Sequence, residues 1–262
     1  MAEEKISFDD GGAYERSMGV WSRLAGEIFL DWLAPPRGLR WLDVGCGSGA
    51  FTELIVERCA PAEAHGIDPS DAQLAFARTR PAAGVAEFRQ GDAMALPYPD
   101  DRFDAAVMAL VLFFVPDPDK GVAEMARVVR PGGVVAAYLW DFEAGGFPLA
   151  PIQTGLREMG RTPVLPPSVR VSGPDALRQV WVEAGLVDIE SRSISVSRSF
   201  ASFEEFWSVS TAGSSMRAVI ERMAPTEVAE LQSRVRAHLP ADAAGRITYR
   251  SLASAIKERV GA

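Results

Sequence analysis

Residues 41–51 combine residue types at a spacing that could bind a nucleotide-like ligand. Their apolar start predicts a short buried strand, residues 45–49 predict a tight turn, and the apolar residues that follow at helical spacing predict a helix. Glycine tolerates a positive φ and lets a ligand approach the backbone closely. The first N–H groups of the helix are then available to the ligand.

Two classes of ligand fit this unit. Gly45-x-Gly47-x-x-Ala50 matches the dinucleotide fingerprint G-x-G-x-x-G/A. The same stretch also reads Asp43-x-Gly45-x-Gly47-x-Gly49. A carboxylate two residues before the first glycine would repel a diphosphate, but it suits a ligand with an ammonium group. S-adenosylmethionine has such a group and carries no phosphate.

The second pattern, D-x-G-x-G-x-G, resembles the first motif of the class I S-adenosylmethionine-dependent methyltransferases. The resemblance implies that the cofactor is S-adenosylmethionine and that S-adenosylhomocysteine is the product. It also implies that Asp43, Gly45, Cys46 and Gly47 contact the cofactor.

A second acidic residue, Asp68, follows a predicted strand over residues 64–68. It lies 23 residues beyond Gly45, where a carboxylate can accept hydrogen bonds from both ribose hydroxyls. Pro69 follows it directly, and Gln73 lies on the helix predicted next. We expect both of these residues to contact the cofactor as well.

A third acidic residue belongs to the block Gly91-Asp92-Ala93-Met94-Ala95-Leu96-Pro97, with Phe103-Asp104 further on. This resembles the family's second block, G-D-A-x-x-L-P. The resemblance places Asp92 against the exocyclic amino group of adenine, which is a donor that a carboxylate selects. Ala93 and Met94 would contact the base through backbone N–H groups and apolar surface. A dinucleotide fold does not predict this block.

The reactive end of the ligand is expected where a fourth strand, residues 103–110, ends, because open α/β sheets bind ligands at the carboxyl ends of their strands. Ala109 and Leu110 should lie near the sulfonium. The aromatic residues Phe113, Phe114, Trp140 and Trp207 are candidates for the acceptor pocket. Many relatives that act on quinone-type carbon acceptors carry histidine at the position of Phe113, so a histidine base is not expected there.

The elements that position these residues predict an α/β, Rossmann-like class I methyltransferase fold. We expect seven strands in a mostly parallel sheet with the last strand antiparallel, and helices on both faces. Residues 1–36 are expected to form an N-terminal cap helix, in which Tyr14 contacts the cofactor. Residues 37–199 and 247–262 should form the core. Residues 200–246 should form a helical lid inserted between the last two strands, because a structureless loop of that length is unusual.

Composition limits the partners. The 262 residues carry a net charge of −8 and no cluster of lysines and arginines, which argues against nucleic acid as a partner. Two cysteines and no visible signal peptide favour the cytoplasm. The longest apolar run, residues 105–115, is too short for a membrane span. We expect no metal site, and the oligomeric state, monomer or homodimer, stays open.

These observations favour methyl transfer to a small, apolar or aromatic acceptor by in-line displacement. Such a reaction needs alignment and a dry site more than acid–base groups. No catalytic residue is assigned, and His65 and His238 are interpreted as structural. The alternatives are a non-catalytic S-adenosylmethionine-binding protein, an NAD-dependent oxidoreductase, and a methyltransferase acting on nucleic acid or protein.

Overall fold

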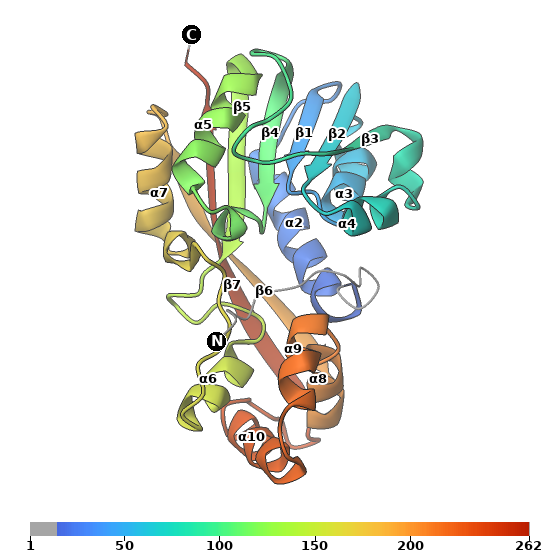
Figure 1. Cartoon of the computed structure of the whole chain (residues 1–262), viewed down its shortest axis with the longest axis vertical. Helices are drawn as coiled ribbons and strands as arrows, with labels where there is room; N and C mark the ends of the chain where they lie inside the picture. Colours follow the sequence, from blue (N-terminus) through green and yellow to red (C-terminus); the bar gives the residue numbers. More distant parts are fainter. Residues whose placement is uncertain (1–14, 262) are drawn as a thin grey trace.

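The computed structural model describes residues 15–261, without the side chains of residues 15, 16, 214 and 215. One seven-stranded sheet, in the order β3-β2-β1-β4-β5-β7-β6, organises the chain (Figure 1). The first five strands pair in parallel, and β7 is antiparallel to both of its neighbours. The strands are β1 (Arg40–Val44), β2 (Glu63–Asp68), β3 (Ala86–Gln90), β4 (Phe103–Ala109), β5 (Val129–Trp140), β6 (Glu190–Phe200) and β7 (Ile247–Arg259). This is the predicted class I methyltransferase topology.

Helices cover both faces of the sheet. The α-helices of the described residues are α2 (Val20–Leu33), α3 (Ala50–Cys59), α4 (Asp71–Ala77), α5 (Pro118–Val128), α6 (Ala150–Glu158), α7 (Pro174–Glu183), α8 (Phe203–Ser210), α9 (Ser214–Glu221) and α10 (Pro225–Ala237). A π-helical turn, η1 (Glu15–Gly19), precedes α2, and three 3-10 turns are η2 (Pro81–Gly84), η3 (Leu112–Phe114) and η4 (Val169–Ser172).

The central strands are buried on both faces, so they read as nearly continuous apolar runs. On one face, Phe29 of α2 packs on Tyr138 of β5 with the ring centroids 4.7 Å apart, and Phe51 of α3 joins them. On the other face, Met125 of α5 is fully buried in the same core. The packed sheet therefore fixes the positions of its strand ends and of the loops that follow them.

The last two strands are longer than the sheet they close. Residues 253–259 of β7 pair with β5, whereas β6 pairs with β7 as far as Ile247. The ribbon of β6 and β7 therefore continues past β5 toward α8, α9 and α10, as Figure 1 shows. These three helices lie between β6 and β7 in the chain, and α10 packs on α6.

The sequence predicts a fifth strand over residues 134–140 and a sixth over residues 187–197, and the limits of both differ in the structure. β5 begins at Val129 rather than Val134, because Val129 pairs with Phe103 and an irregularity in register accommodates the Pro131–Gly133 segment. β6 runs to Phe200 and begins at Glu190 rather than Val187, whose side chain is 72% exposed. The buried, alternating positions Ile194, Val196 and Phe200 fix its register.

Candidate functional site

The glycine turn joins β1 to α3 beside the end of β2. Gly45, Gly47 and Gly49 have φ values of 74°, 51° and 78°, a region that other residues rarely adopt. The N–H of Gly45 donates to the carbonyl of Ile67 at 2.7 Å. A Cβ on Gly45 would lie 2.3 Å from Cγ1 of Val111, so only glycine fits between the neighbouring strand ends.

Asp43, at the end of β1, is an almost fully buried carboxyl group, with 1% of its surface exposed. Thr52 Oγ1 donates to its Oδ2 at 2.6 Å, and its Oδ1 has no hydrogen-bond partner within the described chain. Burial raises the pKa of Asp43 to about 7; the Thr52 hydrogen bond opposes the shift and the charge of Asp68 adds to it. A cationic group near Oδ1 would restore the charged form.

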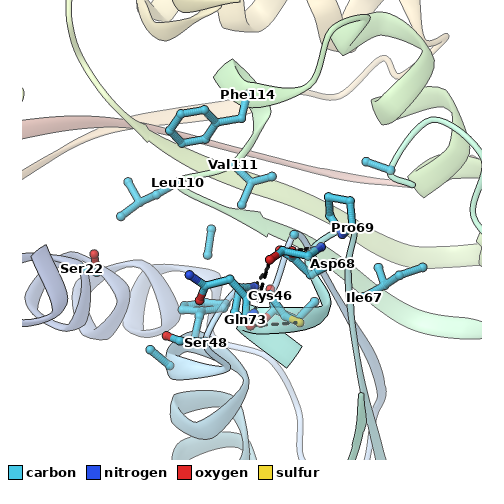
Figure 2. A pocket seen from close by; sticks show the side chains of 18 of the residues that line it. Ser22, Cys46, Ser48, Ile67, Asp68, Pro69, Gln73, Leu110, Val111 and Phe114 are labelled. Atoms are coloured by element: carbon cyan, nitrogen blue, oxygen red, sulfur yellow. Dashed lines mark hydrogen bonds between the residues drawn. The ribbon is translucent and has the colours of Figure 1, made fainter. Parts of the chain in front are cut away.

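Asp68, at the end of β2, is held by backbone donors. The N–H of Gly47 donates to Oδ2 at 2.9 Å and the N–H of Ser70 donates to Oδ1 at 2.8 Å. Burial raises the pKa of this carboxyl group, and the two N–H donors oppose the shift. Figure 2 shows Asp68 beside Cys46 and Gln73 at the wall of one pocket. The carboxylate is therefore oriented before any ligand arrives.

Asp92 follows β3 and is exposed to solvent. Its Oδ1 accepts a hydrogen bond from the N–H of Met94 at 2.8 Å, and its carbonyl accepts one from Ala95 at 3.1 Å. The carboxylate thus lies in a tight turn, where a backbone N–H binds one of its oxygens and the other oxygen is available to a ligand. Gly91, Asp92 and Ala93 line the same pocket as Asp43 and Asp68.

The pocket is a cavity of about 430 Å³ at the carboxyl ends of β1, β2 and β4. Twelve residues predicted from the sequence line it: Asp43, Gly45, Cys46, Gly47, Asp68, Pro69, Gln73, Asp92, Ala93, Ala109, Leu110 and Phe114. Four others, Met94, Phe113, Trp140 and Trp207, do not line it. Tyr14 lies outside the described residues.

The end of the cavity beside β4 is apolar. Leu110, Val111, Phe114, Val115 and Pro116 line it, and Figure 2 shows the first three around the opening. Leu110 has φ 63°, a left-handed conformation that costs a residue with a side chain about 1–3 kcal/mol and is typical of functional sites. Its N–H donates to the carbonyl of Tyr138 at 2.8 Å, which holds that conformation.

Several lining residues were not predicted, among them Ser22, Arg80 and Tyr138. Arg80 Nε donates to the carbonyl of Ser48 at 2.5 Å and Nη1 pairs with Glu53 at 2.7 Å, so Arg80 holds the glycine turn from the segment between α4 and η2. Ser22, Arg80 and Tyr138 belong to separate parts of the chain that only the tertiary fold brings to the cavity. Val111 could have been found, because it directly follows Leu110.

Residues 42–137 match the family model described as a methyltransferase domain. These residues run from within β1 to most of β5 and include all three aspartates at the cavity. This part of the chain belongs to the class I S-adenosylmethionine-dependent methyltransferases. The cofactor of that family is S-adenosylmethionine.

Relatives of this chain differ in the atom that their names say they methylate. A phosphatidylethanolamine N-methyltransferase of Cereibacter sphaeroides is 38% identical over 130 residues, which is 48% of this chain and 62% of the relative. A ubiquinone/menaquinone biosynthesis C-methyltransferase of Roseobacter denitrificans is 36% identical over 121 residues (45% and 48%). A fatty-acid O-methyltransferase of Mycolicibacterium smegmatis is 39% identical over 100 residues (38% and 36%). The chain thus spans less than two thirds of each relative.

Solved structures share the fold of this chain over nearly its full length. The YcgJ protein of Bacillus subtilis superposes with a TM-score of 0.59 at 17% identity, covering 91% of this chain and 98% of that one. Phosphoethanolamine N-methyltransferase 2 of Haemonchus contortus, in complex with S-adenosylhomocysteine, gives 0.55 at 15% identity, covering 98% and 61%. At such identities these likenesses concern the fold alone.

The cavity suits a cationic cofactor without phosphate. Its lining holds four carboxylates, Asp43, Asp68, Asp92 and Glu53, and two arginines. Both arginines are paired: Arg80 with Glu53, and Arg23 with Glu57 at 2.8 Å. The unpartnered Oδ1 of Asp43 is a buried acceptor that an ammonium group would satisfy.

Two further features are absent from residues 15–261. No helix there is long and apolar enough to cross a membrane. No group of three or more histidine, cysteine, aspartate or glutamate side chains in that part of the chain could hold a metal ion.

Proposed function

We propose that this protein transfers the methyl group of S-adenosylmethionine to a small organic acceptor. The observation that carries the proposal is that three strand-end carboxylates, Asp43, Asp68 and Asp92, open into one cavity whose far end, beside β4, is apolar. The polar end of the cavity would bind the nucleoside and amino-acid parts of the cofactor. The apolar end would exclude water from the place where the methyl group is transferred.

Each carboxylate is assigned one group of the cofactor. Asp43 receives the ammonium, because its buried Oδ1 needs a donor. Asp68 receives the ribose hydroxyls, since Gly47 and Ser70 already orient its carboxylate by hydrogen bonds. Asp92 receives the exocyclic amino group of adenine, while Ala93 lies beside the base.

The chain contributes alignment and exclusion of water to the reaction. When bound, the cofactor supplies an electrophilic methyl group on a sulfonium. Leu110, Val111 and Phe114 form the apolar wall beside β4 and would keep water from the acceptor. The face of Phe114 can also stabilise a neighbouring cation. Holding donor and acceptor in line is enough to supply several kcal/mol, about 7–11 at best.

The acceptor is proposed to be apolar or aromatic. Phe114 begins a series of ring contacts that leads away from the cavity: Phe114 to Phe113 at 4.7 Å, Phe113 to Phe142 at 5.5 Å, and Phe142 to Phe147 at 4.5 Å. The rings of Phe142 and Phe147 are stacked and half-buried, so part of their surface is open to an acceptor. The names of the relatives include C-, N- and O-methyltransferases, so they do not select the acceptor atom.

We propose that the helical insertion, residues 200–246, acts as a lid. Phe206 of α8 packs on Phe200 and Tyr249 of the ribbon, with ring centroids 5.2 and 6.4 Å apart. A Cβ on Gly213 would lie 3.2 Å from Ser17 Oγ in η1, and Gly19, at the end of that turn, lines the cavity. The insertion therefore touches the segment that forms one wall of the cofactor site.

Calorimetric titration with S-adenosylmethionine, S-adenosylhomocysteine and NAD, each separately, tests the cofactor assignments. Micromolar binding of both sulfur nucleosides and none of NAD is expected. Mass spectrometry of mixtures with candidate phenols, quinols, amines and fatty acids then tests turnover, with a gain of one methyl group as the expected product. Cofactor binding without transfer to any acceptor would favour a non-catalytic binding protein, and binding of NAD alone would contradict the proposal.

A further inference from the structure

Asp92 lies on a connection that has no helix or strand of its own. Residues 91–102 lead from β3 to β4. The N–H of Gly91 donates to the carbonyl of Asp68 at 3.2 Å, and an isolated bridge joins Asp92 and Ala95 in the first turn. An exposed loop of this length would normally be mobile. A carboxylate that must discriminate between purine bases needs a fixed position, so something outside the loop has to hold it.

Two charged residues of α5 hold the far end of that turn. Glu124 Oε2 accepts a hydrogen bond from the N–H of Leu96 at 2.8 Å. Arg127 Nη2 donates to the carbonyl of Leu96 at 3.1 Å, and its Nη1 donates to the carbonyl of Tyr98 at 2.9 Å and to Asp100 at 2.7 Å. Both backbone polar groups of Leu96 are therefore bound to one pair of side chains.

The pair itself is rigid. Arg127 Nε and Nη2 donate to the two oxygens of Glu124 at 2.7 and 2.8 Å, which is a bidentate contact between planar groups. The hydrogen bonds from Arg127 lower the pKa of Glu124, and the carboxylate raises that of Arg127. The side chains are only 19% and 33% exposed. Lysine could not replace this fork, because it has a single charged nitrogen.

The anchored residue, Leu96, is four positions from Asp92, and the residues between them form a hydrogen-bonded turn. Ala95 N–H donates to the carbonyl of Asp92, and Met94 N–H donates to its carboxylate. Leu96 is buried, with 4% of its surface exposed. Movement of Leu96 would therefore move the carboxylate of Asp92.

We propose that Arg127 and Glu124 are positioning residues for the recognition of adenine, acting through Leu96 on Asp92. This inference rests on the proposed function, in which Asp92 accepts the exocyclic amino group of the base. The pair touches no atom of the cofactor cavity. Its loss should therefore weaken the choice between bases more than it weakens binding of the ribose and the amino acid.

The experiment compares two ligands on the same protein sample. One is S-adenosylhomocysteine, and the other is its inosine analogue, in which a carbonyl oxygen replaces the exocyclic amino group. Calorimetry on the full chain gives both dissociation constants, and their ratio does not depend on the fraction of folded protein. We expect the wild type to prefer the adenine ligand by at least about thirtyfold, since a lost hydrogen bond to a charged group and an unpaired carboxylate both oppose inosine.

Arg127→Gln should lower that ratio about tenfold, mainly by weakening the adenine ligand, and Arg127→Lys should not restore it. Glu124→Gln keeps an acceptor for Leu96 but loses the charged fork, so a smaller loss of about threefold is expected. Arg130→Gln is the matched control: Arg130 pairs with Asp104 at 2.6 Å and makes no contact with residues 91–101 that the structure records.

Three outcomes are decisive. An unchanged ratio in Arg127→Gln, with the wild type selective, would overturn the positioning role and leave the proposed function intact. An equal fall in Arg130→Gln would also overturn it, because the effect would then be a general loss of positive charge. Failure of the wild type to bind either ligand would instead overturn the proposed function.

Discussion

Substitution of Asp43 by asparagine should make the ligand-free protein more stable at neutral and alkaline pH. In the folded protein, burial raises the pKa of Asp43 to about 7, from 3.8 for the unperturbed group. Asparagine has the same shape and retains an oxygen for Thr52 Oγ1, which donates to Asp43 at 2.6 Å. The variant therefore removes the cost of a buried charge without opening a cavity.

The sign and size follow from proton linkage. Above pH 4 the unfolded carboxyl group loses its proton, whereas the folded one keeps it until about pH 7. The free energy of unfolding of the wild type should therefore fall as pH rises from 4 to 7 and stay constant above 7. One pKa unit corresponds to 1.36 kcal/mol, so this contribution amounts to about 4 kcal/mol. Asp43→Asn lacks it.

Binding should show the opposite dependence on pH. A cofactor ammonium favours the ionised carboxyl group, so the wild-type dissociation constant for S-adenosylhomocysteine should fall by up to tenfold per pH unit from pH 5.5 toward 7. The variant should bind weakly and without this dependence. Urea denaturation at pH 4.5, 6 and 8, and calorimetry from pH 5.5 to 7.5, measure both effects. A variant that is less stable than the wild type at pH 8, or that keeps the wild-type pH profile of binding, would refute the reasoning.

Three further changes test other parts of the site. Asp68→Ala should weaken cofactor binding by about 1.5–3 kcal/mol, because charge-assisted hydrogen bonds are lost; calorimetry showing an unchanged affinity would remove Asp68 from the ribose site. Gly45→Ala and Gly132→Ala both place a side chain on a residue with φ 74°. A Cβ on Gly45 would lie 2.3 Å from Val111, whereas the nearest atom to a Cβ on Gly132 is 3.8 Å away. Thermal unfolding should show a loss of about 1 kcal/mol for Gly132→Ala and about 1–3 kcal/mol more for Gly45→Ala, and equal losses would contradict the clash. Replacing residues 203–238 by a short glycine–serine linker should abolish acceptor turnover and leave cofactor affinity within about tenfold, since none of these residues lines the cavity; loss of cofactor binding by a folded core would count against the lid.

Most of the residues predicted to bind the cofactor line one cavity, and the sequence could bring them together because the information is local. Asp43, Asp68 and Ala109 each lie at the end of a parallel strand, and parallel strands bring their carboxyl ends to one edge. The glycine turn is equally local, since its backbone angles are available mainly to glycine. The sheet order also agrees with the expectation from pattern and family resemblance.

Of the four aromatic residues predicted for the acceptor pocket, only Phe114 lines the cavity. The positions of the other three side chains depend on tertiary packing. Trp140 lies in β5 beyond Tyr138, on the same face, and its side chain is 2% exposed and does not reach the cavity. Trp207 stacks on Phe203 of its own helix. Tyr138 reaches the cavity instead, because Gly26 of α2 allows its hydroxyl group to approach; a Cβ there would lie 3.1 Å from that oxygen. Sequence spacing does not contain such contacts between distant elements.

The pairing of β6 and β7 sets off the segment between them, so that this segment could be exchanged for that of another protein. Residues 253–259 of β7 secure the strand against β5, while its first residues pair only with β6. Residues 197–250 thus form one continuous segment, and its two ends meet at a single pair of neighbouring residues in β6 and β7. A segment from another methyltransferase could be grafted at the pair Val196 and Ser251 without disturbing the three aspartates. If the inserted segment selects the acceptor, as proposed, the same cofactor site could serve different acceptors after exchange of this segment alone.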